Sequence, residues 1–319
     1  MYIELHAASA FSFLDGASLP EALVDRAASL GYPALALLDR DGVSCIPRFH
    51  LAAKKAGLKA IIGAELTMTT RGAASESRRP VLASAAPAIF KLPILVASQA
   101  GYRNLCRLVT AMKLRSPKGE GALSLDELDG QTSGLIALAG RAMLSGHRFG
   151  VGGLVDRLVG AFGRANVYLE LQRHLLRDEE ADNHALRDLA AAFHLPLIAT
   201  NGVRFAEPAS RPLYDVLTCI RHKTTIERAG RRLTCNAERY LKSPAQMAAL
   251  FADLPEAITA SRDLADRLSF TMADLGYRFP RYPVPDGESM ASFLRSLTLA
   301  GARERYRPLE APQTRQLER

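Results

Sequence analysis

The chain lacks closely spaced cysteines, long apolar runs and a basic leader. Its four cysteines form no CxxC pair, so neither a zinc ribbon nor a disulfide framework is predicted, and the thiols are expected to be reduced and mostly buried. No apolar stretch approaches the roughly 18 residues that a membrane span needs. The first residues contain acids and no basic segment, which argues against a signal or transit peptide. We therefore expect a soluble, cytoplasmic protein with no membrane partner.

Tryptophan is also absent, and no Gly-rich GxGxxG turn follows an apolar segment. The first absence argues against base-stacking platforms, and the second favours a closed barrel over an open nucleotide-binding sheet. What the chain has is 319 residues, of which 48 % are hydrophobic, enough to bury a large core. Its net charge of +8 favours an anionic partner, and nucleic acid is the commonest one.

Short apolar segments alternate with helical stretches through about residue 205. Seven strands are predicted, at residues 2–5, 34–38, 60–66, 92–98, 134–140, 167–171 and 196–200. This alternation needs right-handed crossovers and a parallel sheet. We therefore predict an α/β fold, a distorted (β/α)7 barrel over residues 1–205. Residues 206–276 are predicted to form a helical extension, and residues 277–319 begin as a Pro-rich linker.

Polar residues follow the predicted strands, where a barrel gathers its functional groups at one mouth. These residues include cations beside acids, namely His6, Asp15, Asp39, Arg40, Glu65, Lys91, Arg141 and Arg204. A hydrolase barrel would need several His and carboxylate ligands converging to hold its metals. Cations in the same mouth would repel those metals.

Several stretches resemble one protein family in the same order along the chain. Residues 5–42, LHAASAFSFLDGASLPEALVDRAASLGYPALALLDRDG, are similar to the opening of the PHP (polymerase and histidinol phosphatase) domain of bacterial C-family DNA polymerases. KKAGLKAIIGAEL, YLELQRH and LIATNGVRF continue the resemblance, and the AGRRL and NAER segments look most like the error-prone, ImuC-type branch. The resemblance implies a PHP-type distorted barrel with a small helical annex. It also implies a longer parent protein, whose palm region would begin within residues 277–319.

The resemblance also implies where metal ligands would stand. Metal-bearing members read HxH on the first strand, TDH after the second, GxE on the third and DxH after the last, with further ligands near the fourth and fifth strands. Only His6, Asp15 and Glu65 keep ligand chemistry at these positions. The other vestigial positions are Ala8, Arg40, Lys91, Arg141, Gly202 and Arg204. The resemblance therefore implies a barrel that has lost its metals.

Guanidinium groups can replace the charge of lost metals, because they are permanently protonated and bind carboxylates through two donors. Without metals, Asp15, Asp39 and Glu65 would face one another unscreened. We predict that these acids pair with Arg40, Arg141 and Arg204, together with Lys91. Glu170 alternates with Leu169 and Leu171 and is a further candidate acid inside the barrel. His174 lies near a strand tip, where a hydrogen-bonded loop histidine is the simpler interpretation.

One stretch after the barrel is dense in cations. It contains Arg221, Lys223, Arg228, Arg231 and Arg232. This density suits phosphate contacts whose strength falls with salt. A solvated face, or a contact with the rest of the parent polymerase, is the alternative.

Two functions remain open from the sequence. The first is a metal-free, catalytically inactive pseudo-PHP domain, a scaffold and partner surface in an error-prone translesion DNA polymerase that acts in damage-induced mutagenesis. The parent would be a DNA-directed DNA polymerase that uses Mg²⁺ in its palm, whereas residues 1–319 would hold no cofactor and no catalytic residues. DNA, translesion accessory proteins and the sliding clamp are the expected partners. The alternative is an active metal-dependent PHP phosphoesterase or 3′–5′ proofreading exonuclease.

Overall fold

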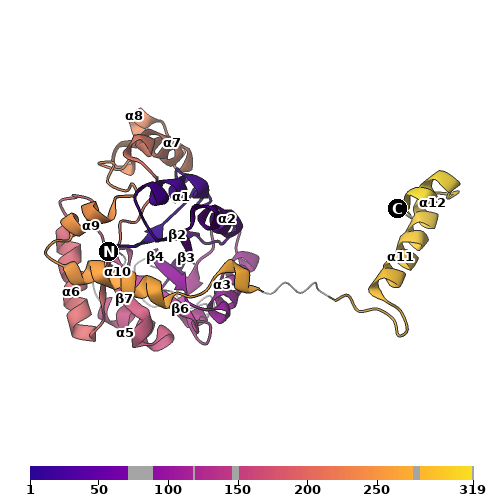
Figure 1. The fold of residues 1–319 in the computed structure, drawn as a ribbon, viewed down its shortest axis with the longest axis horizontal. Helices are drawn as coiled ribbons and strands as arrows, with labels where there is room; N and C mark the ends of the chain where they lie inside the picture. Colours follow the sequence, from indigo (N-terminus) through magenta and orange to yellow (C-terminus); the bar gives the residue numbers. More distant parts are fainter. Residues whose placement is uncertain (71–88, 118, 146–150, 276–280, 318–319) are drawn as a thin grey trace, which may run out of the picture. The chain divides into compact units, whose positions relative to one another are not determined.

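A curled sheet surrounded by helices forms the first and larger of two units (Figure 1). The computed structural model describes residues 1–70, 89–117, 119–145, 151–275 and 281–317. The two units divide the chain into Met1–Leu275 and Gly276–Arg319. The sequence-based division of the first unit at residue 205 stays a prediction.

The sheet contains every strand that the sequence predicts, in the spatial order β1-β2-β3-β4-β6-β7-β8. The bounds are β1 (Glu4–Ala7), β2 (Ala34–Arg40), β3 (Lys59–Thr69), β4 (Ile89–Val96), β6 (Leu135–Ala139), β7 (Val167–Leu171) and β8 (Leu197–Ala199). A short extra strand, β5 (Leu123–Ser124), pairs with β3. A parallel bridge between Ala7 and Val203 joins the first strand to the segment after the last. The sheet therefore curls toward closure, which confirms the distorted barrel.

One strand departs from the predicted all-parallel sheet. β4 pairs antiparallel with β3 and with β6, while the other neighbours on this path are parallel. An apolar run does not encode its direction, and antiparallel neighbours need no helical crossover. Gly63 permits the close approach, because a Cβ there would lie 2.2 Å from the carbonyl oxygen of Ile94. The reversal places the beginning of β4, and not its end, at the mouth formed by β2 and β3.

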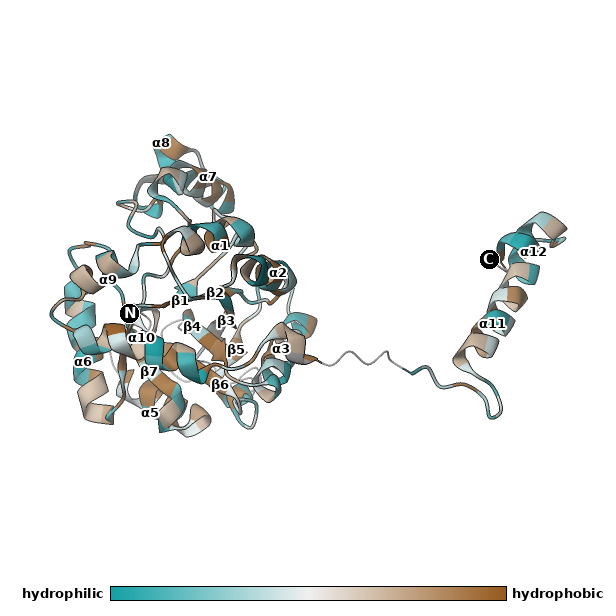
Figure 2. Ribbon diagram, viewed as in Figure 1, coloured by the Kyte–Doolittle hydropathy of each residue, from teal (hydrophilic) through white to brown (hydrophobic). Residues whose placement is uncertain are grey.

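Helices cover the outside of this sheet. They are α1 (Pro20–Ser29), α2 (Ile46–Ala56), α3 (Gln99–Arg115), α4 (Arg141–Ser145), α5 (Val151–Phe162) and α6 (Glu179–Phe193), with short 3-10 turns η2 (Leu125–Leu128) and η3 (Arg164–Asn166). Prolines open α1 and α2, where the missing amide hydrogen costs nothing. Gly57 ends α2 in the left-handed region, at φ 70°. Figure 2 shows hydrophilic and hydrophobic residues mixed along α2 and α6, as expected for helices with one buried face.

The core has two layers. The larger cluster lies between the strands and the outer helices. The smaller cluster fills the inside of the curled sheet with alternate strand residues, which include Leu5, Leu38, Ile61, Leu95, Ile136, Leu138, Tyr168 and Ile198. The helix α10 (Pro255–Arg267) packs against β1 and β8. It therefore completes the inner cluster with Leu264 and Ala265, together with Leu268 directly after the helix. An apolar floor therefore underlies the polar mouth of the barrel.

The helical part that follows β8 begins with η4 (Pro208–Ser210) and α7 (Arg211–Arg221). It continues through α8 (Ile226–Ala229), η5 (Gly230–Arg232), α9 (Pro244–Leu250), α10 and η6 (Met272–Leu275). Ser243 caps α9 by accepting from the amide of Gln246, with Pro244 in the first turn. In Figure 1, α7 and α8 project beyond the barrel at the top.

In its described residues, 281–317, the second unit contains α11 (Met290–Arg305) and α12 (Ala311–Leu317). The assignment of its residues to the start of a palm region stays a prediction. Within the described ranges, none of the helices combines the length and apolarity that crossing a bilayer requires.

Candidate functional site

Strand alternation brings two acids to the inner face of the barrel mouth. Glu65 shares the face of Ile61 on β3, and Glu170 shares the face of Tyr168 on β7, both of which belong to the inner cluster. Both carboxylates are buried. The polar mouth therefore begins one layer above the apolar floor.

His6 reaches the same layer through an irregularity in β1. The register between β1 and β2 shifts between Glu4 and Ala7, which changes the side-chain alternation after Leu5. The imidazole of His6 then lies between two carboxylates, with Nδ1 2.7 Å from Oε1 of Glu170 and Nε2 3.0 Å from Oε2 of Glu65. Burial lowers the pKa of His6, but the two carboxylates outweigh it and raise the pKa to about 9. His6 is therefore a buried imidazolium at neutral pH.

Arg204 forms the predicted ion pair with Glu65. Its Nη2 donates to Oε2 of Glu65 at 2.8 Å, and the Arg204 residue is 7 % exposed. Burial raises the pKa of Glu65, but Arg204 and His6 together hold it well below its usual range. Burial lowers the pKa of Arg204, and Glu65 and Asp15 outweigh it, so the net shift is upward. One carboxylate oxygen thus accepts from two cations.

Asp15 lies at the edge of the mouth and binds a residue that the sequence did not assign to it. Arg221 of α7 donates from Nη1 to Oδ1 of Asp15 at 2.7 Å, whereas Nη1 of Arg40 is 3.7 Å from Oδ2. The hydroxyl of Tyr214 also donates to Asp15, at 3.2 Å. Burial raises the pKa of Asp15, but the nearby Arg204 and Arg221 outweigh this effect, so the net pKa is lowered. The pairing of Arg40 with Asp15 is therefore the weaker of the two.

The prediction that Asp39 pairs with an arginine is wrong. Its carboxylate accepts from the backbone amide and hydroxyl of Ser9, at 2.7 and 2.8 Å, and from the hydroxyl of Ser12 at 2.6 Å. Three hydrogen bonds satisfy this buried acid without a cation. Asp39 faces the outer layer of the sheet, since it follows Leu37 at a spacing of two residues and Leu37 belongs to the outer cluster. Asp39 therefore stabilises the loop after β1.

Arg141 and Lys91 also differ from their predicted pairings. Arg141 lines the mouth, but its Nε donates to Asp182 at 2.6 Å and its Nη1 to Glu179 at 3.2 Å, both on α6. Lys91 enters the mouth because β4 is antiparallel, and its ammonium donates to the hydroxyl of Thr67 at 2.6 Å. These partners come from distant segments, so strand-tip reasoning could not assign them.

Ala8 and Gly202 hold no side chain that could bind a ligand. The amide of Ala8 donates to the carbonyl of Val203 at 2.9 Å and so helps to close the barrel. Gly202 has φ +54°, and a Cβ there would lie 2.7 Å from Nε2 of Gln172. At these two vestigial positions the structure therefore uses the backbone and not a side chain.

The structure confirms that His174 is a hydrogen-bonded loop histidine. Its Nδ1 lies 2.7 Å from Oε1 of Glu179, and its Nε2 lies 2.8 Å from the carbonyl oxygen of Asn201. Burial lowers its pKa, and the partly opposing hydrogen bond with Glu179 does not reverse this shift. His174 therefore joins the loops that follow β7 and β8.

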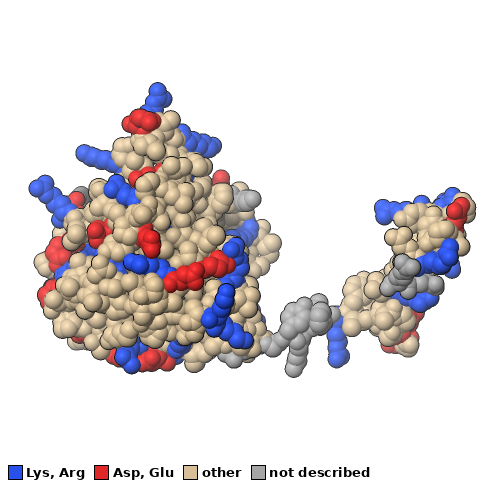
Figure 3. Space-filling view, turned by 45° about the horizontal axis from the view of Figure 1, so that its top comes forward, with Lys and Arg blue, Asp and Glu red and all other residues tan. Residues whose placement is uncertain are grey.

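The cation-rich stretch separates into one bound arginine and an exposed set. Arg221 is held by Asp15, as described above. The exposed set has no carboxylate within salt-bridge distance among the described residues and consists of Lys223, Arg228, Arg231 and Arg232. Figure 3 shows several basic side chains at the narrow end that carries α7 and α8, with an acidic group among them, and acids and bases mixed on the rest of the visible face. We call Lys223, Arg228, Arg231 and Arg232 the basic tip.

The residues at the mouth do not fit the metals that the family resemblance implies. Both ring nitrogens of His6 are taken by carboxylates, and Arg204 lies against Glu65. Asp15 belongs to a separate pair with Arg221. No group of three or more His, Cys, Asp or Glu side chains is arranged to hold a metal ion in the described part of the chain. A metal would have to displace a buried guanidinium from its carboxylate.

A small cavity of about 300 Å³ opens over this mouth. Besides the residues above, it is lined by Arg239, which sequence reasoning did not assign to the site. The amide of Arg204 donates to the carbonyl of Arg239 at 2.9 Å, and Phe205 forms a bridge with Tyr240. This pairing joins segments 35 residues apart along the chain. No local pattern in the sequence indicates it.

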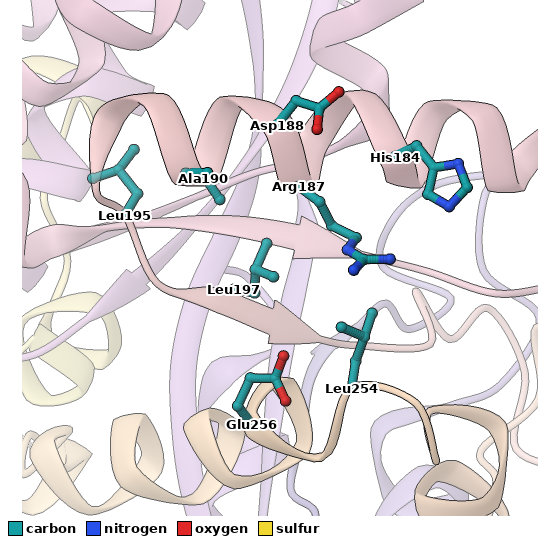
Figure 4. Close-up of a pocket in the computed structure, with 9 residues that line it drawn as sticks. His184, Arg187, Asp188, Ala190, Leu195, Leu197, Leu254 and Glu256 are labelled. Atoms are coloured by element: carbon teal, nitrogen blue, oxygen red, sulfur yellow. The ribbon is translucent and has the colours of Figure 1, made fainter.

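A larger cavity of about 800 Å³ lies elsewhere, between α6, β8 and the start of α10. Figure 4 shows Arg187 of α6 and Glu256 of α10 on opposite sides, with Leu197 and Leu254 between them. Its charged residues are of both signs, and none of the residues predicted for a site lines it. The mouth therefore remains the candidate site.

A sequence model of the PHP domain matches residues 4–174, more than half of the chain. The chain belongs to the PHP domain family. It is also 41 % identical over 288 residues to an error-prone DNA polymerase of Anaeromyxobacter dehalogenans, a match that covers 89 % of the chain and 24 % of that protein. An error-prone DNA polymerase of Mycobacterium bovis is 37 % identical, with 96 % of the chain and 28 % of that protein covered. The chain thus spans about a quarter of the length of these relatives.

Among solved structures, an amidohydrolase from Chromobacterium violaceum aligns with a TM-score of 0.43 and 17 % identity, over 64 % of this chain and 88 % of that one. The family assignment of this PHP domain rests on the sequence match. The predicted resemblance to the PHP region of error-prone DNA polymerases is confirmed by the two relatives.

Proposed function

We propose that this chain is the PHP region of an error-prone translesion DNA polymerase, and that it acts there as a metal-free, non-catalytic scaffold. One observation carries the proposal. A single oxygen of Glu65 accepts from both His6 and Arg204, so the carboxylate that would bind a metal is already bound by two buried cations. Such a mouth gains its stability from fixed charges of the chain itself.

The same residues leave no group for metal-free hydrolysis. A general base must be able to accept a proton from water. His6 is held as an imidazolium between Glu65 and Glu170, and Glu65 is held ionised by Arg204. Metal-dependent phosphoesterases instead generate hydroxide on an ion, and the donor set does not fit that ion. Structural support of the polymerase is the role that this arrangement supports best.

For the parent protein we propose DNA-directed DNA polymerisation with Mg²⁺ in the cytoplasm, as part of damage-induced mutagenesis. The support is the similarity to proteins named error-prone DNA polymerase. DNA is the proposed substrate partner, and the basic tip is a proposed contact to its phosphates. Translesion accessory proteins and the sliding clamp are proposed as protein partners of the parent.

Primer extension with the full-length protein and with residues 1–275 tests this proposal. We expect extension only by the full-length protein, and no release of nucleotides from a 3′ end by either protein in the presence of Mn²⁺. A full-length variant with Arg204→Ala should lose stability, and its extension should fall in parallel with the folded fraction. Turnover of a 3′ end that depends on His6 and Glu65 would contradict the proposal in favour of an active phosphoesterase or proofreading exonuclease.

A further inference from the structure

Helix α7 exposes three large apolar side chains to solvent. They are Leu213, Val216 and Ile220, with exposed fractions of 51 %, 41 % and 56 %. Each other α-helix in the described part of the first unit exposes at most one large apolar side chain. Contiguous exposed apolar surface on a soluble protein marks an interaction site. We call Leu213, Val216 and Ile220 the apolar ridge.

The apolar ridge occupies a single face of α7. Its residues are spaced by three and four positions, which places their side chains on the same side of a helix. Elsewhere on α7, Arg221 and Tyr214 both bind Asp15. Arg211, at the beginning of the helix, donates from Nη2 to the carbonyl oxygen of Thr234 at 2.7 Å. The ridge therefore lies on a helix that is already held in place, which lowers the entropic cost of binding a partner.

The basic tip continues directly from the apolar ridge. The amide of Lys223 donates to the carbonyl oxygen of Ile220 at 3.2 Å, and the next amide donates to that of Cys219 at 3.0 Å. This turn leads into α8, which packs against α7 and exposes Ile226. Apolar and cationic side chains therefore share the projection that α7 and α8 form in Figure 1.

The basic tip makes this projection positively charged. Residues 222–232 contain the four cations of the tip and one acid, Glu227, so their net charge is +3. Within the described ranges, none of the four cations has a carboxylate within 4.0 Å. The basic side chains at the narrow end are visible in Figure 3. A ligand that fits this surface must therefore combine an apolar face with negative charge.

Three other occupants fit this surface less well than an acidic helix. A second copy of the chain would bring like charges together. A DNA backbone would bind the basic tip but leave the apolar ridge in water. Helices that lie on membranes favour Trp and Phe on the inserted face, whereas the ridge has only aliphatic side chains. An amphipathic helix with acidic flanks covers both the ridge and the tip.

We propose that α7 and α8 dock an acidic amphipathic helix of a partner protein. The apolar side of that helix packs on the apolar ridge, and its flanking carboxylates pair with the basic tip. The inference goes beyond the proposed function and does not depend on the state of the barrel mouth. The DNA contact proposed above uses the basic tip alone, so the partner helix and DNA exclude each other there.

Fluorescence anisotropy with the 319-residue chain tests the inference. The probe is a labelled helical peptide of about five turns, with leucines at helical spacing and glutamates on both flanks. We expect saturable binding that weakens as salt is added, because salt screens the flanking ion pairs. Ile220→Ser and Leu213→Ser should each weaken binding about tenfold, as expected for apolar contacts at the centre of an interface. Arg228→Gln should weaken binding and reduce its dependence on salt.

Matched controls separate this projection from other exposed side chains. Leu51→Ser on α2 and Leu114→Ser on α3 remove exposed leucines elsewhere and should bind the peptide as the wild type does. A peptide with lysine in place of every glutamate should not bind. No binding of the acidic peptide by the wild type, equal binding of the lysine peptide, or equal weakening by Leu51→Ser overturns the inference. Melting temperatures show that the variants are folded, since substitutions at exposed sites change stability little.

The other occupants are tested with one of the same variants. Ile220→Ser should leave three properties unchanged, namely binding of a short DNA duplex, the sedimentation coefficient, and binding to vesicles that contain phosphatidylserine. A loss of duplex binding would assign the ridge to DNA, a loss of self-association to a second copy, and a loss of vesicle binding to a membrane. Each of these three losses overturns the inference.

Discussion

At the mouth, positively charged side chains bind the carboxylates that metal ions would otherwise bind. Glu65 accepts from His6 and Arg204, Glu170 accepts from His6, and Asp15 accepts from Arg221. Each acid therefore has a cationic donor within hydrogen-bond distance. The buried pairs and the more exposed pairs should differ strongly in their contribution to the free energy of unfolding.

Arg204→Ala should lower the free energy of unfolding by about 3–5 kcal/mol, because it leaves Glu65 buried with only His6 as counter-charge. Arg157→Ala is the matched control, since Arg157 and Asp126 form an exposed pair on α5 and η2. That control should cost about 0–1 kcal/mol. Urea denaturation of residues 1–275 measures both. Equal losses in the two variants would show that the mouth is open to solvent.

The stabilisation by His6 should depend on pH. Its folded pKa of about 9 lies above the value of about 6.5 expected for an unfolded histidine, so the native state binds the proton more tightly. The advantage of wild type over His6→Gln in free energy of unfolding should be full below about pH 6.5 and disappear as the pH rises to about 9. Denaturant curves across this range measure the difference. An advantage that grows with pH would mean that the imidazole is neutral in the native state.

At the scale of elements, α10 completes the inner core and closes the floor under the site. Leu264 is fully buried within the inner cluster, beside strand residues such as Ile3 and Ile198. Leu264→Ala should destabilise the protein by about 2–5 kcal/mol through the cavity it leaves. Leu213→Ala on the exposed face of α7 is the control and should change stability by at most about 0.5 kcal/mol. Equal effects in thermal and urea unfolding would mean that α10 does not complete this core.

The sequence could predict where the strands lie, but it could not predict the direction of β4. All seven apolar segments became strands, because buried strands require such runs wherever they pair. The antiparallel direction of β4 was not predictable, since an apolar run carries no direction. That direction decides that Lys91 stands at the mouth and bonds to Thr67.

The site was predictable where residues lie on the inner face of a strand or directly after it. Glu65, Arg204 and the location of Glu170 follow from alternation and strand ends. Arg221, Arg239 and the serine partners of Asp39 come from loops and helices whose packing sets their position. The same packing, with α6 against β7, turns Arg141 toward Glu179 and Asp182.

At the scale of the whole molecule, the basic tip is the described surface that suits a nucleic acid backbone. In the full-length protein, replacing Lys223, Arg228, Arg231 and Arg232 together by alanine should weaken DNA binding and flatten its salt dependence, because each lost phosphate contact removes about 0.9 from the logarithmic slope. Lys54→Ala with Lys55→Ala on the exposed face of α2 is the control. Fluorescence anisotropy over a range of salt measures the slope. An unchanged slope would assign the tip to solvent or to a protein contact.

The proposed scaffold role depends on guanidinium and imidazolium groups occupying the mouth in place of metals. Crystals of tag-free protein soaked separately in Mn²⁺ and Zn²⁺, with anomalous scattering measured for each metal, test this claim most directly. We predict no anomalous peak within coordination distance of His6 or Glu65, and Arg204 still bound to Glu65. A full-occupancy peak on His6 and Glu65, with Arg204 displaced from the carboxylate, would contradict it.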